Sequence, residues 1–189
     1  QVIERHIALT SRGKKIAPTH EQTFDPSLSK ADVDLCETTR SLGKLQQVRR
    51  SQPQMSRAAG ASILLAGPPG TGKTAYASYL ATQLSVPLIS RRASDLLSAY
   101  LGATEKNLAA AFSEAEERDG ILLIDEADSF LRSRESAHRS WEVTQVNEFL
   151  TQMESFQGIL ICCTNFAESL DLASLRRFSW KITFSPPDK

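Results

Sequence analysis

A glycine-rich turn between an apolar run and a helix-like segment constrains this chain more than any other feature. The apolar run covers residues 62–66, the helix-like segment covers 75–80, and the turn reads Gly67-Pro68-Pro69-Gly70-Thr71-Gly72-Lys73-Thr74. This is the GxxxxGK[ST] pattern, which cradles phosphates where it joins a strand to a helix. Its glycines let consecutive backbone N–H groups turn inward around phosphate oxygens, and the helix N-terminus adds unpaired donors and partial positive charge. Lys73 would neutralise the β- and γ-phosphates, and Thr74 would offer a hydroxyl to Mg²⁺. These residues predict a site for a nucleoside triphosphate.

The composition is that of a soluble domain. The chain has 189 residues, of which 41% are hydrophobic and 23% charged, which is enough for one domain with its own core. Its 22 basic and 22 acidic side chains balance, so no general basic field indicates a nucleic acid or an acidic membrane as partner. No apolar stretch reaches membrane-spanning length. The chain begins at Gln1 rather than Met, so we expect a fragment or a processed product.

The cysteines indicate where the protein works. There are three of them, Cys36, Cys162 and Cys163, which are too few and too badly spaced for a disulfide scaffold. The last two lie in an apolar run, where small buried thiols are expected. Both points favour a reducing, cytoplasmic compartment.

The first part of the chain differs from the rest. Residues 1–31 are polar, contain Pro18 and Pro26 and have no sustained periodicity. We expect residues 1–20 to be a flexible extension and residues 21–189 to form the nucleotide-binding unit. Ser29-Lys30-Ala31-Asp32 could be the capping box of a helix. That helix would carry Leu35, Leu42, Leu45 and Val48 on one side.

From Ala61 onward, short apolar runs alternate with helical segments. The further apolar runs cover residues 87–90, 121–124, 159–163 and 180–184. The two central runs are apolar at every position, as expected of parallel strands covered on both faces. Between the apolar runs, one helical face carries Leu108, Phe112 and Ala115, and another carries Val146, Leu150 and Met153. The alternation predicts a doubly wound α/β sheet with its ligand beyond the carboxyl ends of the strands.

A second acidic element follows the apolar run 121–124. It reads Asp125-Glu126-Ala127-Asp128, and a carboxylate at the end of a buried strand points into the crevice where the phosphate loop also opens. Asp125 could hold Mg²⁺ as a hard oxygen ligand. Glu126 could take the proton of an attacking water. The alternative for these acids is a helix start favoured by the helix dipole.

The phosphate loop and this acidic element together resemble the Walker A and Walker B segments of the AAA+ ATPases, in the spelling of the AAA subfamily. The resemblance covers about residues 60–186 and extends to the helix-like segment 146–154. It implies a five-stranded parallel sheet of the P-loop NTPase type with strand order 5-1-4-3-2, and ATP or ADP with Mg²⁺ as ligands. Asn165, in Cys163-Thr164-Asn165, matches the family's sensor 1, which touches the γ-phosphate or the attacking water. An uncharged amide could orient that water.

The resemblance also implies a ring. Residues 170–178 are similar to the family's arginine-finger segment, whose arginines reach the neighbouring subunit's nucleotide. Arg176 and Arg177 are adjacent here, whereas the common family pattern separates the two arginines by a Pro-Gly pair, so either could be the finger. A homo-oligomer, as a hexameric ring in the full-length protein, is implied. The family's helical lid would begin where this chain ends, so we expect nucleotide binding but weak or absent hydrolysis from this piece.

Fewer residues indicate which substrate the ATPase would act on. Tyr100-Leu101-Gly102 is similar to the aromatic–hydrophobic–glycine pore loop of AAA unfoldases, which grips an extended polypeptide. The alternative for Tyr100 is a side chain that packs the loop onto the domain. Residues 132–140 are a weaker channel candidate, and Glu154-Ser155-Phe156 weakly resembles the family's intersubunit signalling element.

Two functional classes remain at this stage. The first is chaperone-like protein remodelling or unfolding, with a polypeptide substrate or an adaptor as partner. The second is an ATP-gated assembly or adaptor switch that threads nothing. A nucleic-acid motor is disfavoured by the zero net charge, and neither nucleic acid nor membrane is an expected partner of this segment.

Overall fold

One parallel sheet organises the molecule. The computed structural model describes residues 24–51, 60–98, 100, 102–131, 140–166 and 170–186. Its strands are β1 (Ala61–Ala66), β2 (Leu88–Arg92), β3 (Ile121–Asp125), β4 (Ile159–Thr164) and β5 (Trp180–Thr183). They lie in the order β2-β3-β4-β1-β5, and every pair is parallel. This is the predicted order, read from the opposite edge.

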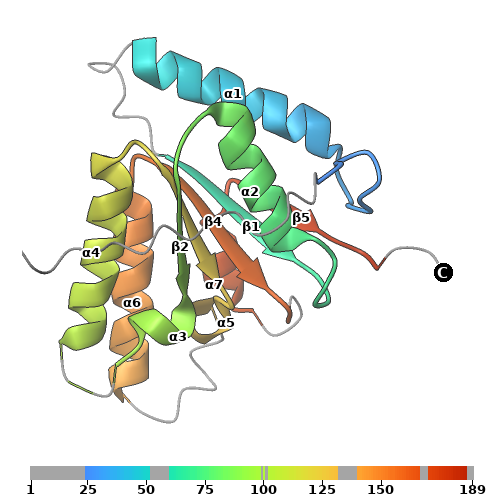
Figure 1. The fold of residues 1–189 in the computed structure, drawn as a ribbon. Coiled ribbons are helices and arrows are strands. Elements are labelled where there is room, and N and C mark those ends of the chain that lie inside the picture. Colours follow the sequence, from blue (N-terminus) through green and yellow to red (C-terminus); the bar gives the residue numbers. More distant parts are fainter. Residues whose placement is uncertain are drawn as a thin grey trace, which may run out of the picture.

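Helices cover both faces of the sheet (Figure 1). One face carries α1 (Leu35–Ser51) and α2 (Lys73–Leu84). The other carries α3 (Ala93–Leu96), α4 (Ala103–Glu117), α5 (Asp128–Leu131), α6 (Ser140–Ser155) and α7 (Leu172–Leu175). Consecutive residues of β3 point into opposite layers: Leu122 belongs to the α4–α6 core and Leu123 to the α1–α2 core. This two-sided burial explains why the central strands are apolar at every position.

The helical faces and the buried thiols agree with the sequence. Leu108, Phe112 and Ala115 of α4 and Val146, Leu150 and Met153 of α6 are all buried. Cys162 and Cys163 are buried in β4, whereas Cys36 is exposed. No helix in the described ranges is both long and apolar enough to span a bilayer. The predicted extension 1–20, residues 132–139 of the second channel candidate and Leu101 lie outside the described residues.

The first helix begins later than the capping box predicted. Asp34, not Ser29, caps α1: its Oδ1 accepts the N–H groups of Cys36 at 2.8 Å and Glu37 at 3.1 Å. The Ser29 box is wrong because the chain there lies along the edge of β5, where the Asp32 N–H donates to the Thr183 carbonyl at 3.0 Å. The predicted apolar side is also only partly right. Leu35 and Leu42 are buried, Leu45 is half-buried and Val48 is 57% exposed.

Candidate nucleotide site

The glycine-rich loop leaves β1 and enters α2 through left-handed backbone. Gly67 has φ 144°, and a Cβ there would lie 2.2 Å from the Phe184 carbonyl oxygen, so a larger residue does not fit. The Gly67 N–H donates to the Thr164 carbonyl at 3.2 Å, which ties the loop to β4. Gly72 has φ 94° and provides no side-chain cap to α2. The first turn of α2 therefore keeps N–H donors for an anion.

Lys73 is held in the loop by its full set of donors. Its side chain is largely buried, at 7% exposure. Its Nζ donates to the carbonyls of Gly67 at 2.7 Å and Pro68 at 2.8 Å, and to Asn165 Oδ1 at 2.8 Å. Burial lowers the pKa of Lys73 below its usual range, and neighbouring negative groups, including Asp125, oppose this shift. An anion that binds here would replace some of these oxygens and offset the cost of burying the charge.

Thr74 and Asp125, the two residues that the sequence suggested as Mg²⁺ ligands, lie side by side. The Thr74 hydroxyl donates to Asp125 Oδ2 at 3.0 Å. Both oxygens are hard donors, and Mg²⁺ takes few protein ligands because it keeps waters and phosphate oxygens. Within the described ranges, no cluster of three or more His, Cys, Asp or Glu side chains could form a metal cage. The pair fits a cation that shares its coordination with a phosphate.

Glu126 is exposed and has left-handed backbone, with φ 55°. Its N–H donates to Asp125 Oδ1 at 2.9 Å, and the following N–H, of Ala127, donates to the Cys163 carbonyl at 2.9 Å. Residues other than glycine rarely adopt this backbone conformation. The two hydrogen bonds constrain the turn after β3 in it. Glu126 therefore lies directly after Asp125, at the carboxyl end of β3.

Asn165 follows β4 and accepts a hydrogen bond from Lys73, so the predicted sensor lies beside the lysine of the glycine-rich loop. Two neighbours of this residue were not singled out by sequence reasoning. Thr164, at 1% exposure, donates its hydroxyl to the Asp128 carboxylate, which is itself 8% exposed. The only signal for this pair was the last acid of the Asp125–Asp128 element.

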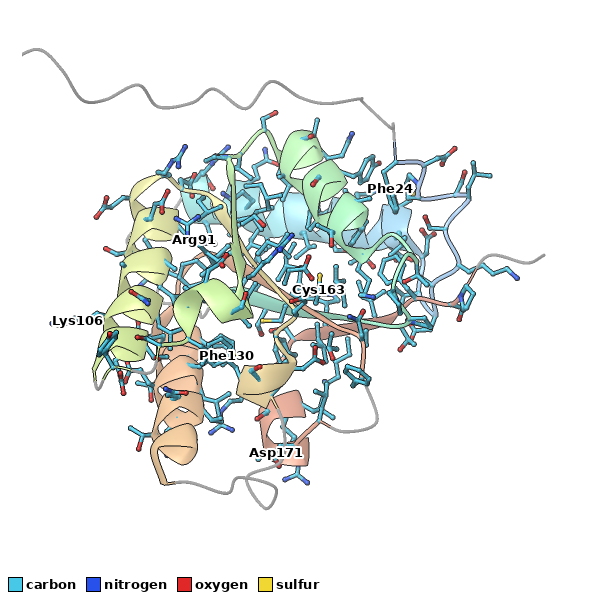
Figure 2. The ribbon with its side chains drawn as sticks, turned by 60° about the horizontal axis from the view of Figure 1, so that its bottom comes forward. Phe24, Arg91, Lys106, Phe130, Cys163 and Asp171 are labelled. Carbon is cyan, nitrogen blue, oxygen red and sulfur yellow. The ribbon has the colours of Figure 1, made fainter. Side chains whose placement is uncertain are left out.

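Phe24, which is labelled in Figure 2, packs its ring against two tyrosines of α2. The Phe24 ring lies 5.8 Å from that of Tyr76 and 5.6 Å from that of Tyr79, measured between centroids. A Cβ on Gly72 would lie 3.2 Å from the Phe24 ring. The Phe24 ring therefore reaches the glycine-rich loop.

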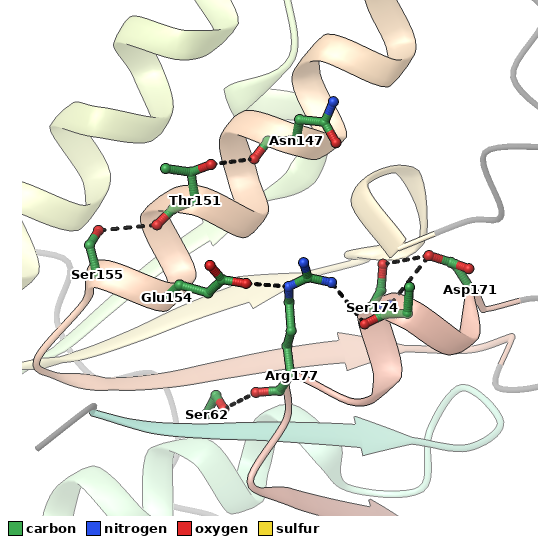
Figure 3. Close-up of polar contacts among 9 residues, drawn as sticks. Ser62, Asn147, Thr151, Glu154, Ser155, Asp171, Ser174 and Arg177 are labelled. Atoms are coloured by element: carbon green, nitrogen blue, oxygen red, sulfur yellow. Dashed lines mark hydrogen bonds and ion pairs between the residues drawn. The ribbon is translucent and has the colours of Figure 1, made fainter.

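The two adjacent arginines have different environments, and Figure 3 shows that of Arg177. Arg177 forms an ion pair with Glu154 of α6 and donates to the Ala173 carbonyl at 2.9 Å. Its own carbonyl accepts the Ser62 hydroxyl at 2.9 Å. Arg176 is exposed, and no ion pair holds it to the part of the chain that the structure describes. Arg177 is thus fixed within its own subunit, while Arg176 is available.

The predicted pore-loop tyrosine is not packed onto the domain. Tyr100 is 81% exposed, although the loop around it is anchored. The Ser98 N–H donates to the buried Thr104 hydroxyl at 2.9 Å, and the Ala103 N–H donates to the Tyr100 carbonyl at 3.2 Å. Gly102, with φ 74°, turns the chain into α4. The anchored loop presents an aromatic ring to solvent.

Comparison with known proteins identifies the family. The family model described as "ATPase family associated with various cellular activities (AAA)" matches residues 63–186. The chain belongs to the AAA family of ATPases. It is 33% identical over 180 residues to the AAA family ATPase y4kL of Sinorhizobium fredii (strain NBRC 101917 / NGR234), a match that covers 93% of this chain and 53% of that protein.

Two further relatives carry informative names. Spastin of Drosophila melanogaster is 36% identical over 141 residues, which cover 70% of this chain and 19% of spastin. The crystal structure of the FIGL-1 AAA domain in complex with ADP superposes with a TM-score of 0.61 and 28% identity, over 80% of this chain and 53% of that one. The chain therefore spans about half or less of the length of these relatives.

Proposed function

We propose that this domain binds ATP and hydrolyses it with Mg²⁺, and that the full-length protein uses the energy to remodel or unfold proteins. The meeting of Lys73, Thr74, Asp125 and Asn165 at one edge of the sheet carries the first part. The Lys73 ammonium is hydrogen-bonded to the Asn165 amide, and the Thr74 hydroxyl is hydrogen-bonded to the Asp125 carboxylate. Membership of the AAA family and the likeness to an ADP-bound AAA domain support the nucleotide.

Each residue has a role in this proposal. The backbone N–H groups of residues 67–74 and the Lys73 ammonium bind the phosphates, and Thr74 and Asp125 would hold Mg²⁺. The bound ion would neutralise charge on the phosphates. Glu126 accepts a proton from the attacking water, and the Asn165 amide aligns that water with the γ-phosphorus. Glu126 is exposed, so closure of the site by other parts of the protein is expected to exclude solvent.

Two substitutions test the nucleotide chemistry. Lys73→Ala should abolish ATP and ADP binding in calorimetry, because the phosphates lose their cation. Glu126→Gln should still bind ATP with Mg²⁺ but should not turn it over in a phosphate-release assay. Normal hydrolysis by the Gln variant would show that Glu126 is not the base, and unchanged affinity in Lys73→Ala would contradict the whole site.

Remodelling is supported by the exposure of Tyr100. The Tyr100 ring is 81% exposed, so it does not pack against its own domain. Its apolar surface is therefore available to a binding partner. The loop lies between α3 and α4, at the carboxyl end of β2 (Figure 1). In a ring, copies of this loop would line a channel and contact an extended polypeptide independently of its sequence.

Substitution of Tyr100 separates remodelling from a switch. In the full-length protein, Tyr100→Ala should abolish unfolding or processing of a protein substrate while basal ATP hydrolysis continues. Leu28, which is 80% exposed and lies far along the chain from this loop, offers a matched control as Leu28→Ala. If Tyr100→Ala processes substrate normally, the ATP-gated assembly switch becomes the better interpretation.

The arginine pair supports assembly into a ring, and we propose Arg176 as the residue that acts in trans. A permanently charged guanidinium is suited to spread transition-state charge, an effect of about 10³–10⁵ in rate for such fingers generally. Arg177 is already engaged by Glu154, whereas Arg176 is free to reach a neighbour. In the full-length ring, Arg176→Ala should lose hydrolysis and keep ATP binding. Its activity should return when it is mixed with Lys73→Ala subunits, because these supply the missing arginine to an intact site.

A further inference from the structure

A short hydrogen-bond chain runs behind the nucleotide site, between the loop after β3 and the loop after β4. The Phe166 N–H donates to the Thr164 hydroxyl oxygen at 3.1 Å, and the Thr164 hydroxyl donates to Asp128 Oδ1. Thr164 and Asp128 are both buried, so water does not compete for these bonds. Asn165 lies between Thr164 and Phe166, the two residues that take part in this chain of hydrogen bonds.

The chain constrains Asn165 from both sides. The bond on Thr164 fixes the preceding side chain, and the bond to the Phe166 N–H fixes the following peptide. Within the described part of the chain, the Asn165 side chain accepts one hydrogen bond, from Lys73 at 2.8 Å. In the proposed complex, the Lys73 ammonium binds a phosphate of the nucleotide. Its hydrogen bond to Asn165 then cannot hold the amide in place. The backbone on either side of Asn165 must then set where its amide points.

The other end of the chain belongs to the loop that carries Glu126. Asp128 opens α5 and lies two residues after Glu126. A second bond joins the same two loops, from the Ala127 N–H to the Cys163 carbonyl at 2.9 Å. Together the two bonds join the loop that carries Glu126 to the loop that carries Asn165. A water activated by Glu126 and aligned by Asn165 needs this relative placement.

We propose that Thr164 and Asp128 are positioning residues for hydrolysis: the Thr164–Asp128 hydrogen bond sets Asn165 in register with Glu126. This proposal rests on the role proposed above for Asn165. Neither residue touches the nucleotide in it. Loss of the bond should therefore misplace the amide and slow the chemical step, without weakening the phosphate contacts of the loop 67–74.

Variants of Thr164 in the full-length protein test the proposal. Thr164→Val removes the hydroxyl and keeps the shape, Thr164→Ala removes it without placing a methyl group against the carboxylate, and Thr164→Ser keeps it. Val and Ala should lower kcat by about 10- to 100-fold, the usual effect of a small misplacement, with little change in KM or in ADP affinity. Ser should restore most of the turnover. Using two hydroxyl-free variants keeps the test decisive if one of them fails to fold.

A matched control separates positioning from stability. Thr38, in α1, is also buried, and its hydroxyl donates to the Asp34 carbonyl at 2.9 Å. Thr38→Val makes the same chemical change in α1, which carries none of the proposed catalytic residues, so it should lower the melting temperature and leave kcat unchanged. If Thr38→Val and Thr164→Val lose kcat equally at equal loss of stability, the effect of Thr164 is structural and the proposal is wrong.

A double-mutant cycle gives the sharpest outcome. In an Asn165→Ala background, Thr164→Val has no amide left to misplace, so it should change kcat by less than about twofold, the usual error of such cycles. An equal effect of Thr164→Val in both backgrounds overturns the proposal. If Asn165→Ala keeps full turnover, the role of Asn165 falls and this inference falls with it. If Asn165→Ala is inactive but Thr164→Val is fully active, only this inference falls.

Discussion

Replacing Glu126 with glycine should make the domain more stable while it destroys the site. Glu126 has φ 55°, and left-handed backbone costs a residue other than glycine about 1–2 kcal/mol. Its side chain is exposed, so the substitution removes no buried contact, and the bond from its N–H to Asp125 is kept. Glycine also lowers the free energy of unfolding by about 0.5–1 kcal/mol, because it gives the unfolded chain greater conformational freedom. The net gain should be about 0.5–1 kcal/mol in the free energy of unfolding.

Ser85 provides a matched control for this prediction. It ends α2 with φ 53°, nearly the same backbone as Glu126, and its N–H donates to the carbonyls of the last turn. Ser85→Gly should therefore stabilise the domain by a similar amount. For a chain of this length, the gain corresponds to about 1–4 °C in melting temperature, and urea unfolding followed by circular dichroism would resolve it. Hydrolysis by the full-length protein should disappear only in Glu126→Gly.

The unfolding measurement tests whether the backbone at Glu126 is strained, and the hydrolysis assay tests whether its carboxylate is needed for catalysis. If Glu126→Gly is less stable than the parent while Ser85→Gly is more stable, the left-handed turn after β3 is not strained, and the hydrogen bonds around it or the carboxylate itself stabilise it. If Glu126→Gly is more stable but still hydrolyses ATP, the strain is real and has no catalytic purpose. Equal gains with selective loss of turnover would show that the domain gives up stability to place this carboxylate.

The remaining predictions concern stability. Asp34→Ala should cost about 1 kcal/mol in urea unfolding because α1 loses its cap, whereas Ser29→Ala should have no such effect. Leu42→Ala should cost about 2–5 kcal/mol because the side chain is fully buried, whereas Val48→Ala on the same helix should be nearly neutral. Burial raises the pKa of Cys163 to about 12 from a usual 9.0, so the folded state keeps a proton that the unfolded chain loses. Stability should fall as the pH rises from 9 toward 12, by up to about 1.4 kcal/mol per pH unit from this thiol, and Cys163→Ala should flatten the curve.

The sheet was predictable because its strands report their environment directly. A run such as 121–124 is apolar at every position only where both faces are covered, and it proved to be β3. The start of α1 was not predictable from the Ser29 box, because pairing with the edge of β5 competes for the same residues. The better signal was Asp34, followed three residues later by Glu37, which is also a capping pattern. Local sequence offered two starts, and the tertiary structure selected one.

The candidate site was predictable to the extent that each part lies in a contiguous motif. The phosphate loop and the Asp125–Glu126 pair were found in this way, and Asn165 was placed through the family resemblance. Contacts between distant segments were not found. Thr164 and Asp128 are 36 residues apart in the sequence, and they meet only because β3 and β4 are neighbours in the sheet. The ion pair of Arg177 with Glu154 likewise depends on how α6 and α7 lie, so the sequence left the two arginines equivalent.

Three departures from ordinary stability rules coincide with the proposed functions of this domain. Lys73 is a buried cation, Glu126 has left-handed backbone, and Tyr100 exposes a large aromatic ring. The first two cost stability in the isolated domain, and the two core layers offset that cost, whereas the third leaves apolar surface unburied. A phosphate would relieve the first and a polypeptide the third. The strain at Glu126 is relieved by neither, because it belongs to the backbone. It should therefore persist throughout the catalytic cycle, so Glu126→Gly should stabilise the nucleotide-bound domain by as much as it stabilises the free one.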